Sequence, residues 1–244
     1  MSRRLAILGS VVAVLIAGTA LLPRIPQDPA YHQFADTRAW LGIPNFLDVV
    51  SNLPFLLVGI LGLRARPREL WEYRVCFAGV LLTAFGSALY HANPNDITLA
   101  WDRLPMAIGI MGLLSAIITE RTGVVLLGPL CLVGTGSVVY WQVTGDLRLY
   151  ALVQFGPALL IPALILLFPA RYTHANYLLR VVGWYAAAKV FEHFDTQIFA
   201  AGGVISGHTL KHLAAAWACY EIVRMIEVRQ LIGPPASPCS IGPR

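Results

Sequence analysis

The stretch FLDVVSNLPFLLVGILGL, residues 46–63, is long and apolar enough to cross a lipid bilayer as a helix. A membrane-spanning helix needs about 20 predominantly apolar residues. Seven further stretches, on both sides of this one, meet or approach that requirement. They lie at 5–22, 75–92, 102–119, 123–141, 150–168, 181–196 and 207–228. The sequence therefore predicts an all-α, polytopic membrane helical bundle.

The composition of the whole chain supports this class. Hydrophobic residues make up 57% of the 244 positions and charged residues only 13%. Soluble domains carry about 25% charged residues, and here the deficit extends along the entire chain. We therefore expect one membrane domain rather than a soluble domain with a single anchor.

The first apolar stretch follows Arg3 and Arg4, so a cleaved signal peptide is one interpretation of it. Its apolar run is longer than that of a typical signal peptide, which favours a retained anchor. The predicted organisation has four parts: an N-terminal transmembrane anchor helix (1–22), an outer loop (23–45), a seven-helix core (46–229) and a tail (230–244). The tail is rich in Pro and Ser and is expected to be disordered.

The arginines indicate the orientation, because cytoplasmic loops of membrane proteins carry an excess of basic residues. A cytoplasmic N-terminus places twelve arginines inside, namely Arg3, Arg4, Arg64, Arg66, Arg68, Arg74, Arg121, Arg171, Arg180, Arg224, Arg229 and Arg244, and four outside, namely Arg24, Arg38, Arg103 and Arg148. Both termini are then cytoplasmic. We attribute the net charge of +5 to the basic residues that set the topology and contact anionic lipid. No segment resembles a nucleic-acid-binding module.

This topology brings His91, Asp102, His208 and His212 to the outer end of the bundle. An ionisable residue in hydrocarbon costs about 2.5 to 3.5 kcal/mol on insertion scales, so a group of them indicates a function. His208 and His212 are four residues apart and share one helix face. With His91 they provide three ligands and leave one position open, which is the arrangement of catalytic zinc sites. Asp102 is the candidate for proton transfer.

Other polar residues are expected near this site. Ser87 lies one helical turn from His91 and can stabilise an oxyanion, although bonding to a helix carbonyl is the alternative. Glu192, His193 and Asp195 interrupt the stretch 181–196, which must therefore face a protein interior or a water-filled cavity. We expect these three to orient the ligands or relay protons, with His193 also a rival metal ligand.

Together these residues carry a family resemblance. The set Ser87-x-x-x-His91, Asp102 and His208-x-x-x-His212 resembles the alkaline ceramidase family, part of a seven-helix membrane hydrolase superfamily that includes adiponectin receptors. The segment 102–106 is similar to that family's acidic residue followed by Pro-Met, and Ser51-Asn52 to its Ser-Asn pair. The resemblance covers residues 46–229. It implies zinc ligation by the three histidines, proton transfer by Asp102, a stabilising role for Ser87 and a supporting position for Asn52.

The chain also departs from that family. Asn45 stands where eukaryotic alkaline ceramidases carry a glutamate, and the segment 34–40 holds one carboxylate, Asp36. Asp36, Asn45 and Asp48 stay candidates for holding a cation, but the sequence does not favour calcium. The additional N-terminal helix is a second departure. These differences indicate a distant bacterial branch in the inner membrane, with its site near the periplasmic face and a lipid that need not be ceramide.

The predicted function is zinc-dependent hydrolysis of the amide bond of a ceramide-like N-acyl lipid, which yields a fatty acid and an amine. The partner is a membrane lipid, and no protein partner is evident. The alternative is a non-enzymatic membrane receptor or proton-relay protein with a structural zinc site. The four cysteines form no CxxC pair, and the sequence has neither a His-Glu-x-x-His motif nor a Gly-x-Ser-x-Gly motif.

Overall fold

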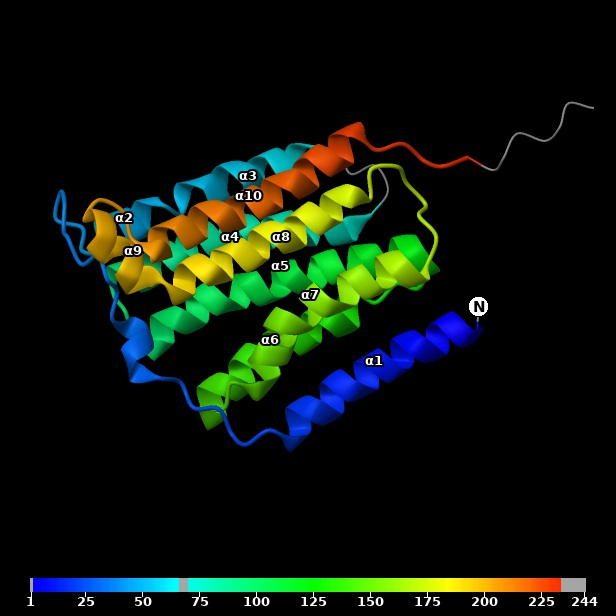
Figure 1. Ribbon diagram of the computed structural model, residues 1–244, viewed down its shortest axis with the longest axis horizontal. Coiled ribbons are helices and arrows are strands. Elements are labelled where there is room, and N and C mark those ends of the chain that lie inside the picture. Colours follow the sequence, from blue (N-terminus) through cyan, green and yellow to red (C-terminus); the bar gives the residue numbers. More distant parts are fainter. Residues whose placement is uncertain (1, 66–69, 234–244) are drawn as a thin grey trace, which may run out of the picture.

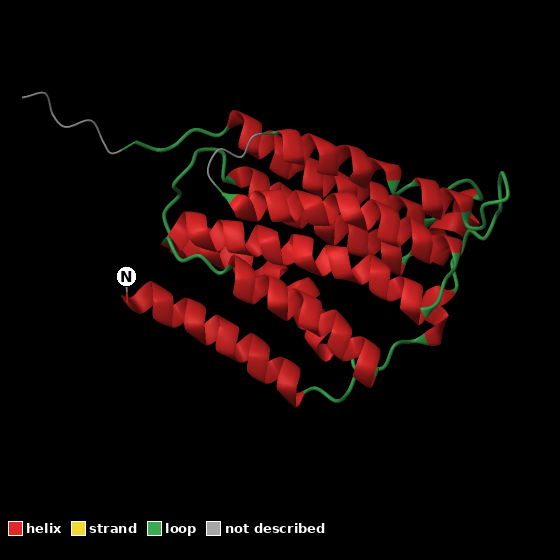
Figure 2. Cartoon of the chain, turned by 180° about the vertical axis from the view of Figure 1, so that it is seen from behind, coloured by secondary structure: helices red, strands yellow, loops and turns green. Residues whose placement is uncertain are grey.

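The computed structural model describes residues 2–65 and 70–233, and these form helices without a β-strand (Figure 1, Figure 2). The helices are α1 (Ser2–Leu21), the short 3-10 helix η1 (Pro29–His32), α2 (Phe46–Val50), α3 (Leu53–Arg64), α4 (Trp71–Ala92), α5 (Asp96–Thr122), α6 (Leu127–Thr144), α7 (Arg148–Leu167), α8 (Asn176–His193), α9 (Asp195–Gly202) and α10 (Gly207–Val228). The helical bundle is thereby confirmed. The predicted disorder of the tail concerns mainly residues 234–244, which lie outside the described part.

The observed helices differ from the predicted stretches in their bounds, and two of the stretches are broken. The stretch 46–63 is divided at Ser51 and Asn52 into α2 and α3. The stretch 181–196 belongs to a helix that begins earlier, at Asn176, and the short helix α9 follows it. The apolar pattern does not reveal these breaks, because Ser51, Asn52 and Phe194 are all compatible with a continuing helix.

Among residues 2–65 and 70–233, five helical segments are long and apolar enough to cross a membrane, which indicates membrane association. They are Arg3–Leu21, Phe46–Arg64, Trp71–Ala92, Asp96–Thr122 and Arg148–Leu167. The stretches that correspond to α6, α8 and α10 fall short of that criterion, so their crossing stays a prediction. Some charged residues of α8 and α10 lie in the interior of the bundle. A helix surface that faces other helices need not be apolar, because it does not contact lipid.

The centre of the bundle is formed by α4 and α5, which pack along their whole lengths, while α10 packs against α8 and α3. Small residues permit this close approach, as they do between membrane helices generally. A Cβ added at Gly79 would lie 2.6 Å from the Cα of Gly109 on the facing helix. The fully buried rings of Tyr73, Phe77 and Tyr90 fill the remaining space along α4.

The first helix lies at the edge of the bundle, where it packs along α7 (Figure 1). No residue of its membrane-compatible segment is buried against the rest of the protein. After α1 the chain runs along the end of the bundle at which α4 ends and α5 and α10 begin. This end, on the left of Figure 1, also holds α2 and α9. It is the end that carries the candidate site.

Candidate metal centre and its pocket

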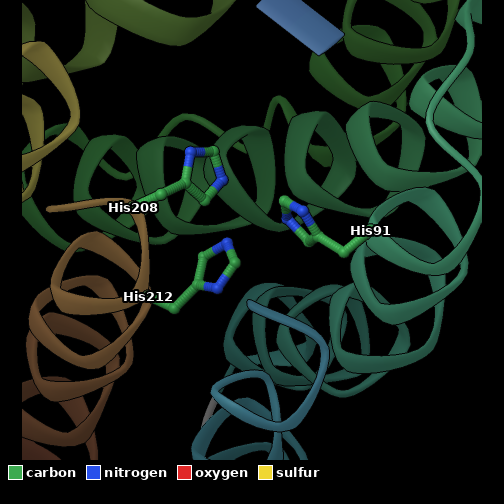
Figure 3. Close-up of side chains that lie close together, drawn as sticks. All are labelled: His91, His208 and His212. Atoms are coloured by element: carbon green, nitrogen blue, oxygen red, sulfur yellow. The ribbon is translucent and has the colours of Figure 1, made fainter. Parts of the chain in front are cut away.

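The three histidines come from two helices that are far apart in the sequence. His91 is the second-last residue of α4, and His208 and His212 occupy the first two turns of α10. Ser206 caps α10 by accepting a hydrogen bond of 3.0 Å from the backbone N–H of Thr209. This cap starts the helix just before His208. As Figure 3 shows, the three rings point toward one another.

The geometry of this histidine group is suited to a metal ion. One ring nitrogen from each residue lies within 4.8 Å of the other two, and all three side chains are buried. Within the described residues, Nδ1 of His91 and Nε2 of His208 have no hydrogen-bond partner. Buried polar atoms without partners are costly, and a shared cation would satisfy both nitrogens. The group can therefore hold a metal ion through neutral imidazoles.

The third histidine is oriented by a serine from the break between α2 and α3. Nδ1 of His212 lies 2.7 Å from Oγ of Ser51, whose hydroxyl also donates to the backbone carbonyl of Asp48 at 3.0 Å. With Nδ1 engaged, Nε2 is the nitrogen left for a metal. Such hydrogen bonds fix the tautomer and ring orientation of metal-binding histidines. Sequence reasoning singled out the Ser-Asn pair only by resemblance.

Two glycines allow the site's helices to approach closely. A Cβ at Gly207 would lie 2.2 Å from the carbonyl oxygen of Phe191, so only glycine lets α10 begin against the end of α8. A Cβ at Gly86 would lie 2.1 Å from the carbonyl oxygen of Trp101. That contact brings Asp102 close to α4, next to Ser87. Neither glycine was recognised from the sequence as part of the site.

Asp102 and Ser87 are buried and line the same pocket as His212. Oδ1 of Asp102 has no hydrogen-bond partner among the described residues, and the Ser87 hydroxyl interacts with this carboxylate. Ser87 makes no hydrogen bond to a helix carbonyl in the described structure, whereas Thr83 donates one to Gly79 at 2.8 Å. Ser87 is thus available to a neighbouring group rather than engaged with its own helix.

The N-terminal segment covers the histidines from outside the bundle. The buried ring of Phe34 lies 4.6 Å from the ring of His91 and 5.1 Å from that of His208, centre to centre. Sequence reasoning treated residues 23–45 as a connecting loop and missed this role. The segment holds three aromatic residues, Tyr31, Phe34 and Trp40, and no spacing in the sequence distinguishes Phe34 from the other two.

The expected supporting residues lie in different surroundings. Glu192 accepts hydrogen bonds from Lys189 at 2.7 Å, from Lys211 at 2.9 Å and from the Tyr31 hydroxyl at 3.2 Å. His193 is exposed at the end of α8 and is not a member of the histidine group. These positions leave Glu192 beside the pocket and His193 outside it.

The two other supporting residues, Asp195 and Asn52, form hydrogen bonds with backbone groups. Asp195 accepts a hydrogen bond of 2.7 Å from the backbone N–H of His208, and its second oxygen accepts one of 3.2 Å from Ala35. It therefore ties the start of α10 to the N-terminal segment. The Asn52 side chain donates to the carbonyl of Asp48 at 2.8 Å and so stabilises the break between α2 and α3.

The three residues considered for calcium are each engaged elsewhere. Asp36 is paired with Arg38, whose Nε and Nη2 lie 2.7 Å from the two carboxylate oxygens. Arg38 also donates to the carbonyls of Gly203 and Val204, and its guanidinium holds the pKa of Asp36 below its ordinary value. Asn45 donates to the carbonyl of His91, and Asp48 accepts from Thr209.

A pocket of about 210 Å³ extends from the histidines into the bundle. Its polar end is lined by Tyr31, Ser87, Asp102, Arg103, Tyr150, Lys189, Glu192, Lys211 and His212. Its apolar part is lined by residues of α4, α5, α7, α8 and α10, among them Val80, Ile110, Leu113, Ile161, Val181 and Ile222. The pocket is therefore amphiphilic, with His212 of the histidine group and Asp102 at its polar end.

Comparison with known proteins finds no family model that matches this sequence and no curated protein that matches it. The functional argument therefore rests on the residues of the site and on the geometry described above.

Proposed function

We propose that the protein is a zinc-dependent membrane hydrolase that cleaves the amide bond of a ceramide-like N-acyl lipid. The observation that carries this proposal is the convergence of three buried histidines, one of which, His212, shares the polar end of an apolar pocket with Asp102, whose Oδ1 has no hydrogen-bond partner among the described residues. Three imidazole ligands with one open position are the ligand set of catalytic rather than structural zinc sites. Zinc in such a site polarises a carbonyl and activates a water molecule at neutral pH.

Asp102 and Ser87 then have different roles in the reaction. Asp102 accepts a proton from the attacking water and delivers it to the nitrogen of the scissile amide. Water oxygen becomes bonded to the carbonyl carbon, the C–N bond breaks, and the products are a fatty acid and an amine. The Ser87 hydroxyl donates a hydrogen bond to the carbonyl oxygen as negative charge develops on it. Both side chains line the pocket that holds His212.

The dimensions of the pocket support an acyl chain as the apolar part of the substrate. Its wall on α5 includes Asp102 at the polar end and Leu113 at the apolar end. Eleven residues of helix span about 16 Å at 1.5 Å per residue. That is about half of a hydrocarbon core about 30 Å thick, so a long acyl chain lies parallel to the bundle while its carbonyl reaches the histidines.

The test is metal content and amide hydrolysis by the purified protein. We expect zinc bound to the wild-type protein, together with release of fatty acid from long-chain N-acyl amides. His208→Ala should lose both, and His193→Ala should retain both, because His193 is exposed and outside the histidine group. Zinc-loaded wild-type protein with no turnover above that of His208→Ala would contradict the hydrolase proposal and favour a receptor or proton-relay protein with structural zinc.

We also propose that the site faces the periplasm of a bacterial inner membrane, with both termini in the cytoplasm. Asn93 is exposed and follows α4 at the end of the bundle that holds the site. A cysteine introduced there, Asn93→Cys, should react with an impermeant thiol reagent added to intact spheroplasts. The wild-type protein is the control for its own cysteines. Labelling that requires permeabilised membranes would reverse the orientation.

A further inference from the structure

Arg103 is the buried cation that the proposed hydrolysis does not use. Its side chain is 6% exposed and lines the pocket. Its guanidinium carbon lies 4.2 Å from the ring centre of Trp141, 4.8 Å from that of Tyr150 and 5.5 Å from that of Tyr31. These rings hold the guanidinium through cation–π contacts, which provide attraction but no hydrogen-bond acceptor.

The guanidinium of Arg103 is not fully paired within the described residues. Nη1 of Arg103 is buried without a hydrogen-bond partner, and Arg103 forms no ion pair with any described carboxylate. A guanidinium has five N–H donors in a fixed plane and stays charged at any ordinary pH. A buried charge without a partner is strongly unfavourable. The pocket therefore contains a buried guanidinium that is held by aromatic rings and has an N–H group left for a ligand.

The other charges on the pocket wall do not neutralise Arg103. Lys189 and Lys211 both bind Glu192, which leaves that trio with one excess positive charge. Asp102 is the second carboxylate of the pocket, so three cations face two carboxylates. The excess positive charge increases when Asp102 accepts a proton during hydrolysis. The polar end of the pocket is thus complementary to an anion.

We infer that the substrate carries a carboxylate on its amine portion, so that it belongs to the N-acyl amino acids, and that Arg103 binds this carboxylate. The inference rests on the proposed amide hydrolysis. A planar carboxylate matches the guanidinium fork through two parallel hydrogen bonds. Asp102, the neighbouring residue on α5, delivers its proton to the amide nitrogen, and both side chains line one pocket. An α-carboxylate, two bonds from that nitrogen, is therefore within reach of Arg103.

The experiment separates binding from turnover by using zinc-depleted protein. N-octanoylglycine carries the carboxylate, and N-octanoylethanolamine replaces it with a neutral group of similar size. We expect calorimetric titration of the full-length protein to give a Kd at least tenfold lower for the glycine conjugate. Arg103→Gln should weaken binding of the glycine conjugate at least tenfold and change binding of the ethanolamine conjugate less than twofold.

Arg103→Lys is the matched control, because it keeps the charge and removes the planar fork. It should bind the glycine conjugate with an affinity between those of the wild type and Arg103→Gln. Equal affinity of the wild type for the two ligands, or an equal loss of both in Arg103→Gln, would overturn the inference. The wild-type comparison decides even where a variant fails to fold. Turnover of zinc-loaded protein is measured separately, so absent hydrolysis with selective binding would contradict the proposed function alone.

Discussion

The two ends of the helical bundle each hold a buried arginine among aromatic rings, but only one of these arginines has a partner. Arg229 forms an ion pair with Glu120, accompanied by the Tyr73 hydroxyl at 3.2 Å and the ring of Tyr172 at 4.3 Å. Arg103, at the end with the histidines, lies among rings and forms no ion pair with a described carboxylate. The buried Arg229 has a carboxylate partner, and the pair stabilises the fold. The buried Arg103 has an N–H group without a partner, at the end of the bundle where a ligand is expected.

The same difference holds for the other buried polar atoms of the described residues. Seven of the nine that lack a hydrogen-bond partner belong to the end with the site, on Gln27, Asp48, Asn52, His91, Asp102, Arg103 and His208. At the opposite end Thr119 donates to Glu72 at 2.8 Å, and Tyr73 donates to Glu120 at 3.0 Å. Because unpaired buried groups reduce stability, their concentration at one end indicates that bound groups complete that end.

The largest effect should follow from changing Asp102, at the unsatisfied end. Asp102→Asn keeps the shape of the side chain but removes its capacity to accept a proton. We expect kcat for amide hydrolysis to fall by about 10²- to 10⁴-fold, the usual contribution of general acid–base catalysis. Zinc content and melting temperature should stay unchanged. Loss of zinc in this variant would instead identify Asp102 as a metal ligand.

The second effect concerns the satisfied end and should appear in stability. Glu120→Ala leaves Arg229 buried without its carboxylate partner, which generally costs about 3–5 kcal/mol of unfolding free energy. Denaturation of the detergent-solubilised protein measures this loss, and zinc content of the folded fraction should not change. Glu227→Ala, on the exposed face of α10, is the control and should be nearly neutral. Similar stability of both variants would remove the contrast between the two ends.

The third effect is on metal affinity. Ser51→Ala removes the hydroxyl that lies 2.7 Å from Nδ1 of His212. Loss of such a supporting hydrogen bond typically weakens metal binding about 10- to 100-fold. Competition with a chelator of known affinity measures the change. Ser137→Ala is the matched control, because the Ser137 hydroxyl is buried but donates only to the carbonyl of Gly134 within α6. An unchanged zinc affinity in Ser51→Ala would show that Ser51 does not orient His212.

The smallest effect should come from Asp36, in the segment that covers the site. Arg38 lowers the pKa of Asp36 in the folded protein, so the pair stabilises the fold above the ordinary pKa of an aspartate, about 3.9. This stabilisation is lost as the pH falls through the lowered folded-state pKa. Asp36→Asn should therefore melt slightly below the wild type at pH 7, and the difference should vanish in strong acid. A difference that persists in acid would assign the effect to something other than the ion pair.

Sequence reasoning located the members of the histidine group because helical geometry relates residues over short distances. His208 and His212 share a face through their spacing of four, and the order of the apolar stretches placed His91 at the same end. The orientation of each ring was beyond such reasoning. Ser51 and His212 are 161 residues apart, and no local pattern connects them. The cover provided by Phe34 and the rings around Arg103 are likewise contacts between distant segments.

By itself, the sequence determined the fold class of this protein, a bundle of apolar helices. Its apolar stretches require helices that satisfy their own backbone hydrogen bonds in lipid, and the few ionisable residues within those stretches must then face the inside of the bundle. Only the tertiary structure decided which of those residues have partners. It paired Arg229 with Glu120 and surrounded Arg103 with rings, although both are arginines in apolar surroundings. The physical reason is that pairing depends on side chains brought together from separate helices, and helix packing alone sets those distances.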